Sequence, residues 1–325
     1  MLKELPPTVE IGILNYPDVH MAAVLGLTDL FKLSDKNKQD KHLPILKISH
    51  WQFDNVTQQV LKVYETYPEL NTEPSIVILP PSLEDPISIQ FAQTYIPWLK
   101  QQHQKGAILA SICAGAFLLG ETGLIQKKKI TLHWQHKELF EKRFPHIELD
   151  LDQLIIDTGD ILTAGGVMAW VDLGLQIVER YLGRKVMIKT AQILLVDPPG
   201  RQQSYYRTFI PRLNHGDEAI LKVQKWLQEV HTQQINLTDL AAYACMEERT
   251  FLRRFKKATG MTSIDYCQHL RVDHAREKLQ ISRTPIDRIA WEVGYNDPSA
   301  FRKVFSRIIG LTPSEYRQRF NSNLH

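Results

Sequence analysis

Between residues 9 and 182, short apolar runs alternate with stretches whose apolar residues recur at helical spacing. The runs at 75–79 and 106–111 are apolar almost throughout, which is typical of strands buried on both faces. Further strands are expected at 9–14, 45–48, 59–63, 154–156 and 161–163, and helices at 20–33, 86–104 and 167–182. Strands bounded by helices predict a layered α/β domain with a mostly parallel sheet.

The pattern is helical beyond residue 217, and part of it repeats. Five positions recur fifty residues further along the chain: Phe251, Phe255, Gly260, Thr262 and Tyr266 return as Phe301, Phe305, Gly310, Thr312 and Tyr316. A repeat of this period indicates a duplicated supersecondary unit. The C-terminal part is therefore predicted to be an all-α domain made of two related units.

The first unit has the order of a helix-turn-helix motif. Thr238 is expected to cap a short helix at 239–244, and Cys245 lies in the turn that follows. A longer helix at 247–259 should end at Gly260, because glycine readily adopts the left-handed conformation that terminates helices.

The second unit repeats this order with a turn that is one residue longer. Thr284 is expected to cap its short helix, and Pro285 suits the first helical position, where no backbone donor is needed. Gly294 lies in the turn, Asp297 caps the second helix, and that helix should end before Gly310.

The second helix of each unit has an apolar face and a hydrogen-bonding face. The apolar faces carry Phe251, Phe255 and Ala258 in one helix and Phe301, Phe305 and Ile308 in the other. The outward positions are Arg249, Thr250, Leu252, Arg253 and Lys256 in the first helix, and Ser299, Arg302 and Lys303 in the second. Such a row suits a DNA major groove, where Arg and Lys donate to guanine. Two solvated amphipathic helices are the alternative, which leaves the repeat unexplained.

The run 239–260 and the segments 289–301 and 311–317 resemble the AraC/XylS transcription regulators. The resemblance implies two DNA-reading helices joined rigidly by a helix at 264–280. It also implies double-stranded DNA and RNA polymerase as partners. Cys245 stands where these regulators usually have glycine, which costs little provided that φ at this residue is negative.

Charge divides unevenly between the two parts of the 325-residue chain. Residues 1–215 contain 22 Lys and Arg against 23 Asp and Glu, whereas residues 216–325 contain 17 against 13. The basic excess thus lies in the part expected to meet phosphates. No apolar run reaches membrane-spanning length, and three scattered cysteines fit neither a disulfide framework nor a zinc site. We expect a cytoplasmic protein without a bound metal or cofactor.

Cys113 lies between the apolar run at 106–111 and a helix that begins with small residues. A strand, a sharp turn and a helix in this order are typical of a nucleophile elbow, where a helix N-terminus lowers a thiol pKa. A cysteine at a strand end is equally well explained as a small buried hydrophobe. The local pattern leaves both interpretations open.

The segments 111–120, 131–134 and 163–166 resemble PfpI-type proteins of the class I glutamine amidotransferase-like fold. The combination with an AraC module is that of the GlxA-type regulators. The resemblance, over about residues 9–196, implies a flavodoxin-like sheet with Cys113 at the nucleophile position and His133 nearby. Ala114, Trp134 and Tyr16 are predicted to line the same pocket, and a place in the hydrophobic core explains Trp134 and Tyr16 at least equally well.

Two departures from the enzymes of that fold argue against catalysis. Pro80-Pro81-Ser82 replaces a Gly-Gly pair, and Pro81 has no N–H for an oxyanion hole. Ala22 and Ala23 stand near the position of the expected acid. We therefore predict a ligand sensor that is not an enzyme. The alternatives are a cysteine hydrolase or amidotransferase with a DNA-binding appendage, and a redox sensor that acts through Cys113.

The sequence thus predicts a transcription regulator with a sensor and dimerisation domain at 1–197, a linker at 198–216 and a DNA-binding domain at 217–325. Its expected partners are double-stranded DNA, a small-molecule effector and a second copy of the chain. No membrane contact is expected.

Overall fold

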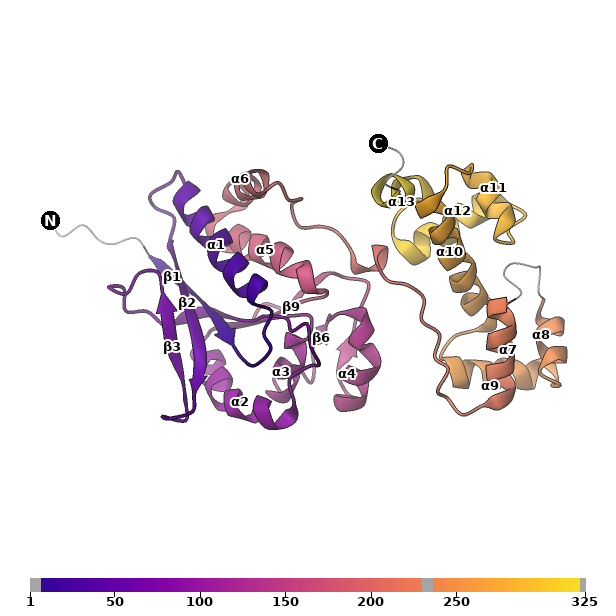
Figure 1. Cartoon of the computed structure of the whole chain (residues 1–325), viewed down its shortest axis with the longest axis horizontal. Helices are drawn as coiled ribbons and strands as arrows, with labels where there is room; N and C mark the ends of the chain where they lie inside the picture. Colours follow the sequence, from indigo (N-terminus) through magenta and orange to yellow (C-terminus); the bar gives the residue numbers. More distant parts are fainter. Residues whose placement is uncertain (1–6, 230–235, 322–325) are drawn as a thin grey trace. The chain divides into compact units, whose positions relative to one another are not determined.

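The computed structural model describes residues 7–229 and 236–321. The chain divides into two compact units, 1–203 and 204–325, which are taken separately below (Figure 1).

In the described part of the first unit, seven strands form one sheet in the order β3-β2-β1-β4-β5-β9-β8. The five central strands are parallel, and β3 and β8 are antiparallel edges. The strands are β1 (Thr8–Asn15), β2 (Ile45–Asp54), β3 (Gln59–Glu65), β4 (Pro74–Leu79), β5 (Ile108–Ile112), β8 (Ile155–Asp157) and β9 (Ile161–Ala164). The predicted α/β fold with a mostly parallel sheet is confirmed.

Helices cover both faces of this sheet (Figure 1). One face is covered by α1 (Met21–Asn37), α5 (Trp170–Leu182) and α6 (Arg184–Leu194), and the other by α2 (Ile89–Gln104), α3 (Gly115–Glu121) and α4 (Lys137–Arg143). Alternation along β4 explains the two cores, because Ile76 and Ile78 pack on the first face and Val77 and Leu79 on the second.

The sequence interpretation missed α4, α6 and the short parallel pair β6 (Lys129–Ile130) and β7 (Glu148–Leu149). Two single-turn helices, η1 (Trp134–His136) and η2 (Val167–Ala169), follow β6 and β9. The strand order reverses between β1 and β4, so the carboxyl ends of β1, β4, β5 and β9 meet at the edge where ligands bind in sheets of this type.

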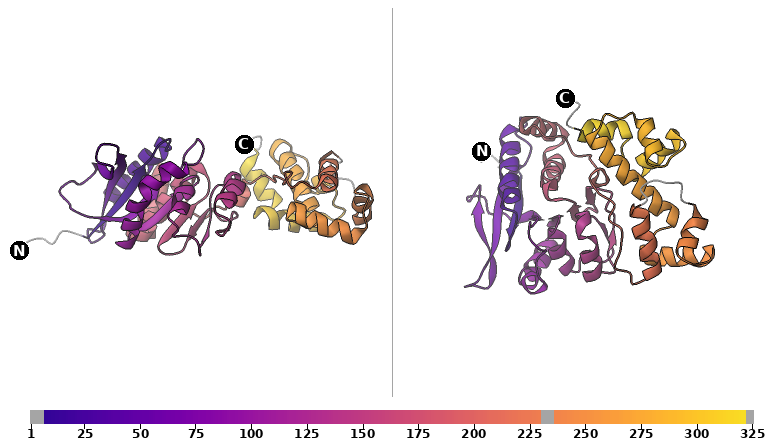
Figure 2. Two further views of the ribbon diagram at one scale, coloured as in Figure 1. Left: turned by 90° about the horizontal axis from the view of Figure 1, so that it is seen from below. Right: turned by 45° about the vertical axis from the view of Figure 1, so that its right-hand side comes forward.

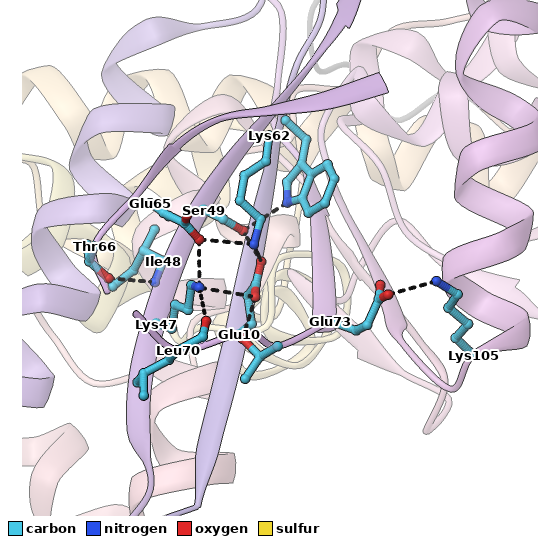
Figure 3. A network of polar contacts seen from close by, with 12 residues as sticks. Glu10, Lys47, Ile48, Ser49, Lys62, Glu65, Thr66, Leu70, Glu73 and Lys105 are labelled. Atoms are coloured by element: carbon cyan, nitrogen blue, oxygen red, sulfur yellow. Dashed lines mark hydrogen bonds and ion pairs between the residues drawn. The ribbon is translucent and has the colours of Figure 1, made fainter. Parts of the chain in front are cut away.

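A network of buried charges joins β1, β2 and β3 (Figure 3). The Glu10 side chain is 0% exposed, and its carboxylate accepts from Ser49 Oγ at 2.7 Å and from Lys62 Nζ at 2.9 Å. Lys47 is 1% exposed, and its Nζ lies 2.6 Å from Glu65 Oε2. Each buried charge therefore has an opposite charge within reach, which offsets the cost of removing it from water.

The second unit consists of helices in its described residues, as predicted. They are α7 (Glu218–Glu229), α8 (Leu237–Tyr243), α9 (Glu248–Thr259), α10 (Ser263–Ile281), α11 (Ile286–Glu292), α12 (Pro298–Ile309) and α13 (Pro313–Phe320). They enclose two small cores, and α10 contributes Tyr266 to the first and Val272, Ala275 and Leu279 to the second. The ribbon views show the long helix α10 running between the two groups of shorter helices (Figure 2). A single helix thus belongs to both helix-turn-helix units.

Three caps in these units can be compared with the sequence expectations. The cap of α8 is Asn236, not Thr238, and Asn236 forms a capping box with Asp239. The cap of α11 is Pro285 in place of Thr284. Asp297 caps α12 as predicted, since its carboxylate accepts from the N–H groups of residues 299 and 300.

The first turn departs from expectation at Cys245, whose φ is 53°. Gly294 has a φ of 86° at the corresponding turn of the second unit. A side chain in this left-handed region costs about 1–2 kcal/mol, so the condition for a low cost, a negative φ at Cys245, is not met. We expect Cys245→Gly to raise the free energy of unfolding by about 1 kcal/mol in urea denaturation of the full chain. Ala244→Gly is the control: Ala244 has a φ of −78°, and glycine there should lower stability.

None of the helices that the structure describes is both long and apolar enough to cross a membrane.

Candidate nucleic-acid interface and cysteine site

Helix α9 presents the first predicted recognition row. Phe251 and Phe255 are 0% exposed and fix one face of the helix in the core, which leaves the opposite face in solvent. Four members of the row are exposed, Arg249, Leu252, Arg253 and Lys256, and Thr250 is half-buried. The geometry therefore allows the long basic side chains of α9 to reach a DNA groove together.

Helix α12 presents the second row. Phe301, Phe305 and Ile309 are buried, so Ile309 occupies the inner position expected for Ile308, which is half-buried. Ser299, Arg302 and Lys303 are exposed. Arg302 Nη2 donates to Asp287 Oδ1 on α11, and this guanidinium must therefore exchange a carboxylate for a base or phosphate on binding DNA.

Helix α10 sets the separation of the two rows. It is continuous over 19 residues, which corresponds to about 28 Å at 1.5 Å per residue. Both cores pack on it, so the two recognition helices are held by one rigid element. The spacing of the two rows is therefore fixed, as contact with two successive major grooves, roughly 34 Å apart on one face of DNA, requires.

A hollow of about 880 Å³ lies beside α9 in the second unit, which the sequence interpretation did not predict. Its lining includes Arg212, Lys222 and Lys257, together with Arg254, whose guanidinium makes two hydrogen bonds to Asp217. Asp217 and Glu218 also line it, so four basic side chains face two acidic ones and the hollow has an excess of positive charge. Chain folding brings residues 212 and 254 together, which explains why no local pattern indicated the hollow.

Cys113 has the backbone of a nucleophile elbow. Its φ is 53°, and its N–H donates to Ala164 O on β9 at 2.8 Å. A Cβ on Gly115 would lie 2.3 Å from Leu79 O, so glycine allows α3 to begin directly against the end of β4. The strand–turn–helix geometry expected from the sequence is therefore present.

The surroundings of the Cys113 thiol keep it protonated. Cys113 is 1% exposed, and burial raises the pKa of this thiol to about 11, although the N–H groups of Ala114 and Gly166 oppose the shift. Tyr16, which is 5% exposed, donates its hydroxyl to Pro80 O, and burial raises its pKa as well. Desolvation thus outweighs the helix end, as expected for a small buried hydrophobe.

His133 lies next to Gly166, and its ring centroid is 5.3 Å from that of Trp134. A Cβ on Gly166 would be 3.9 Å from His133 Cδ2, while the Gly166 N–H interacts with the Cys113 thiol. His133 Nδ1 accepts from the Gln135 N–H at 3.2 Å, which places the ring proton on Nε2. Burial lowers the pKa of His133 to about 4, so the ring is neutral at pH 7. The half-buried His136 ring meets it edge-on, with ring centroids 5.9 Å apart.

The groups that assist catalysis in an active elbow are replaced here. Pro80 and Pro81 follow β4, and the Pro81 carbonyl accepts from the His20 N–H at 2.7 Å, so this turn presents acceptors in place of donors. The first turn of α1 contains no acidic residue. Among the described residues, no group of three His, Cys, Asp or Glu side chains is arranged to hold a metal ion.

The raised thiol pKa leads to a testable difference between two cysteines. With a pKa of about 11, about one Cys113 thiol in a thousand is ionised at pH 8, and burial slows its reaction further. We expect N-ethylmaleimide to modify exposed Cys245 quickly and Cys113 very slowly, with the Cys113 rate rising as pH increases towards 11. Peptide mass spectrometry at a series of pH values measures both rates. A Cys113 rate that is already constant below pH 8 would indicate a reactive thiolate.

Comparison with known proteins gives two family matches. The model of the DJ-1/PfpI family matches residues 59–180, and the model of a helix-turn-helix domain matches residues 240–319. The two matches lie in different structural units.

Three relatives are transcriptional regulators that match about two thirds of this chain. The HTH-type transcriptional regulator GlxA of Rhizobium meliloti is 27% identical over 69% of this chain and 69% of its own length. GbdR of Pseudomonas aeruginosa is 23% identical over 69% of this chain and 61% of its own length. ArgR of Pseudomonas aeruginosa is 27% identical over 68% of this chain and 67% of its own length.

Proposed function

We infer that this chain, which joins a DJ-1/PfpI domain to an AraC-type helix-turn-helix domain, is a DNA-binding transcription regulator. The observation that carries the inference is the pair of exposed basic rows on α9 and α12, both held by α10. Positioned side chains on two helices of a duplicated motif suit two neighbouring segments of one DNA face.

The residues that read DNA are, in this proposal, Arg249, Thr250, Leu252, Arg253 and Lys256 on α9, and Ser299, Arg302 and Lys303 on α12. The arginines and lysines supply charge for phosphates and donors for guanine. Ser299 lies in the first turn of α12, where its hydroxyl and the helix N-terminus both favour contact with a phosphate.

The rigid connection predicts a strict spacing between the two contacted segments of DNA. Inserting about five base pairs between them rotates one segment to the opposite face of the duplex, since one turn is about 10 base pairs. We expect this insertion to abolish tight binding in a fluorescence anisotropy titration. An insertion of about ten base pairs increases the distance between the two segments but keeps them on the same face of the duplex, so it tests the effect of distance alone. Equal affinity for the original and the five-base-pair site would show that the two helices bind independently.

The first unit acts, in this proposal, as a sensor and dimerisation domain in the cytoplasm. Cys113, Ala114, His133, Trp134 and Tyr16 surround the site of a small-molecule effector. A neutral His133, a protonated Cys113 thiol and the absence of an N–H at Pro81 support binding without turnover. An effector at this site regulates DNA binding by stabilising one arrangement of the protein over another. RNA polymerase is the proposed partner at the promoter.

A Cys113→Ser variant separates this function from an enzyme. A sensor with this variant should fold and bind DNA as the natural protein does, because the thiol is neutral and makes no catalytic contact. Hydrolase or amidotransferase activity that is lost in Cys113→Ser would contradict the proposal.

A further inference from the structure

The Gln203 side chain is buried next to the proposed effector site, and both its amide nitrogen and its amide oxygen are hydrogen-bonded. Its side-chain amide donates to Leu132 O and Leu151 O, each at 3.1 Å, and its Oε1 accepts from the Trp134 N–H at 3.0 Å. The residue is 3% exposed although it lies at the very end of the first unit. A polar side chain buried with complete hydrogen bonding specifies one position for the backbone that carries it.

Two neighbouring contacts hold the same segment on the first unit. The Arg201 guanidinium makes two hydrogen bonds to the Asp172 carboxylate, at 2.9 and 2.6 Å. Gln202 forms an isolated antiparallel bridge with Gln153. Residues 201–203, which the sequence assigned to a free linker, are therefore part of the sensor unit.

The residues that follow are held on the second unit in a comparable way. Arg276 of α10 is 5% exposed and donates to the carbonyls of Tyr206 and Arg207. The Phe209 ring stacks on His269 of α10 with ring centroids 5.1 Å apart.

The same segment reaches both helix-turn-helix units. Gln224 of α7 donates to Arg212 O at 3.0 Å, which places that end of the segment against the first core. The Tyr206 ring packs edge-on against Phe320 of α13, next to the second core. Residues 206–212 therefore contact elements of both recognition motifs.

We propose that Gln203 is a latch through which the sensor site controls the DNA-binding unit. Its partners are Thr131, Leu132, Trp134 and Leu151. They include Trp134 of the effector site and flank His133 along the chain. Along the chain, Ser204 and Tyr205 separate the latch from the segment bound to α10. When Gln203 leaves this position, the free tether between the two units lengthens. In the dimer proposed above, more chain freedom must then be lost when the DNA-binding units of both copies bind one DNA site. This inference rests on the proposed function.

A substitution at Gly165, in the first unit, would displace the Gln203 side chain from its hydrogen-bonded position. A Cβ at this position would lie 2.5 Å from Gln203 Nε2, which is the end of a flexible side chain. Gly165→Ala should therefore displace Gln203 while the surrounding backbone stays in place. Gln203→Ala removes the same contacts directly, and Gln192→Ala, which changes an exposed glutamine of α6, is the control.

The test uses the full chain and a double-stranded DNA site selected with the natural protein from a random pool. We expect Gly165→Ala and Gln203→Ala each to weaken binding by at least about five-fold, the lower end of usual allosteric coupling. Hydrogen exchange of residues 201–213 should quicken in both variants. Gly165→Ala should not weaken DNA binding further in a protein that already carries Gln203→Ala, because both changes remove the same interaction.

The outcomes distinguish a wrong role for Gln203 from a wrong function for the protein. Unchanged DNA affinity and unchanged exchange in both single variants would overturn the latch, as would additive effects in the double variant. A natural protein that selects no DNA site would overturn the proposed function instead, and the exchange measurement would still decide whether Gln203 anchors the segment. Thermal unfolding followed by circular dichroism shows that the variants compared are folded.

Discussion

Arg253→Ala is expected to weaken binding of the full chain to its selected DNA site by about 1–3 kcal/mol, or about 5- to 150-fold. Arg253 is exposed at the middle of the α9 row, and its guanidinium carries five donors in a fixed plane suited to guanine O6 and N7. Loss of a base contact should also relax the sequence preference at one position. Binding titrations and selection from a randomised site measure the two effects.

A matched control separates this contact from a general loss of charge. Arg184→Ala removes one positive charge from an exposed position in the first unit, where no DNA contact is proposed. Its effect should be small and should shrink further as salt is raised, because exposed charges more than a Debye length apart are largely screened. If Arg253→Ala retained full affinity and an unchanged sequence preference, α9 would not be a reading helix.

Glu10→Ala is expected to lower the free energy of unfolding by about 3–5 kcal/mol, the usual cost of removing one partner from a buried ion pair. The carboxylate of Glu10 is completely buried and accepts from Ser49, Lys62 and Thr72. Without it, buried Lys47 keeps Glu65 as its one carboxylate partner, and two hydroxyls lose an acceptor (Figure 3). Urea denaturation of the full chain followed by near-ultraviolet circular dichroism measures the change.

Glu73→Ala is the control for Glu10→Ala in the same region. Glu73 pairs with Lys105 at 2.9 Å, but its side chain is 61% exposed (Figure 3). Exposed pairs contribute about 0–1 kcal/mol, so this variant should remain near the stability of the natural protein. Equal losses in the two variants would mean that burial of the network has no special effect on stability.

The sequence determined the elements whose signals are local. The spacing of Phe251, Phe255, Phe301 and Phe305 placed both recognition helices and their inner faces, because helical periodicity follows from backbone geometry. The cap at Asp297 and the αL glycines at 260 and 310 were likewise readable, since each depends on a few neighbouring residues. The apolar runs gave the central strands of the sheet for the same reason.

The tertiary structure decided the state of Cys113, which the local pattern left open. Its pKa depends on burial beneath groups from other strands, among them Tyr16 at the end of β1 and Gly166 after β9. A helix N-terminus and desolvation shift a thiol pKa in opposite directions, and no sequence window shows which one is larger. Likewise, the positive φ of Cys245 could be assigned only from the turn itself.

The seat of Gln203 and the charge network of Glu10 were also decided by the fold. Gln203 bonds to residues that precede it by 52 to 72 positions, and Glu10 bonds to Thr72, which is 62 positions away. In the sequence, Gln203 lies in a polar stretch with the composition of a loop, and Glu10 interrupts an apolar run. The burial and the hydrogen-bond partners of a polar group depend on which distant segments pack together, and the whole chain determines that packing. Helical periodicity and helix caps, in contrast, depend on residues that are close together in the sequence.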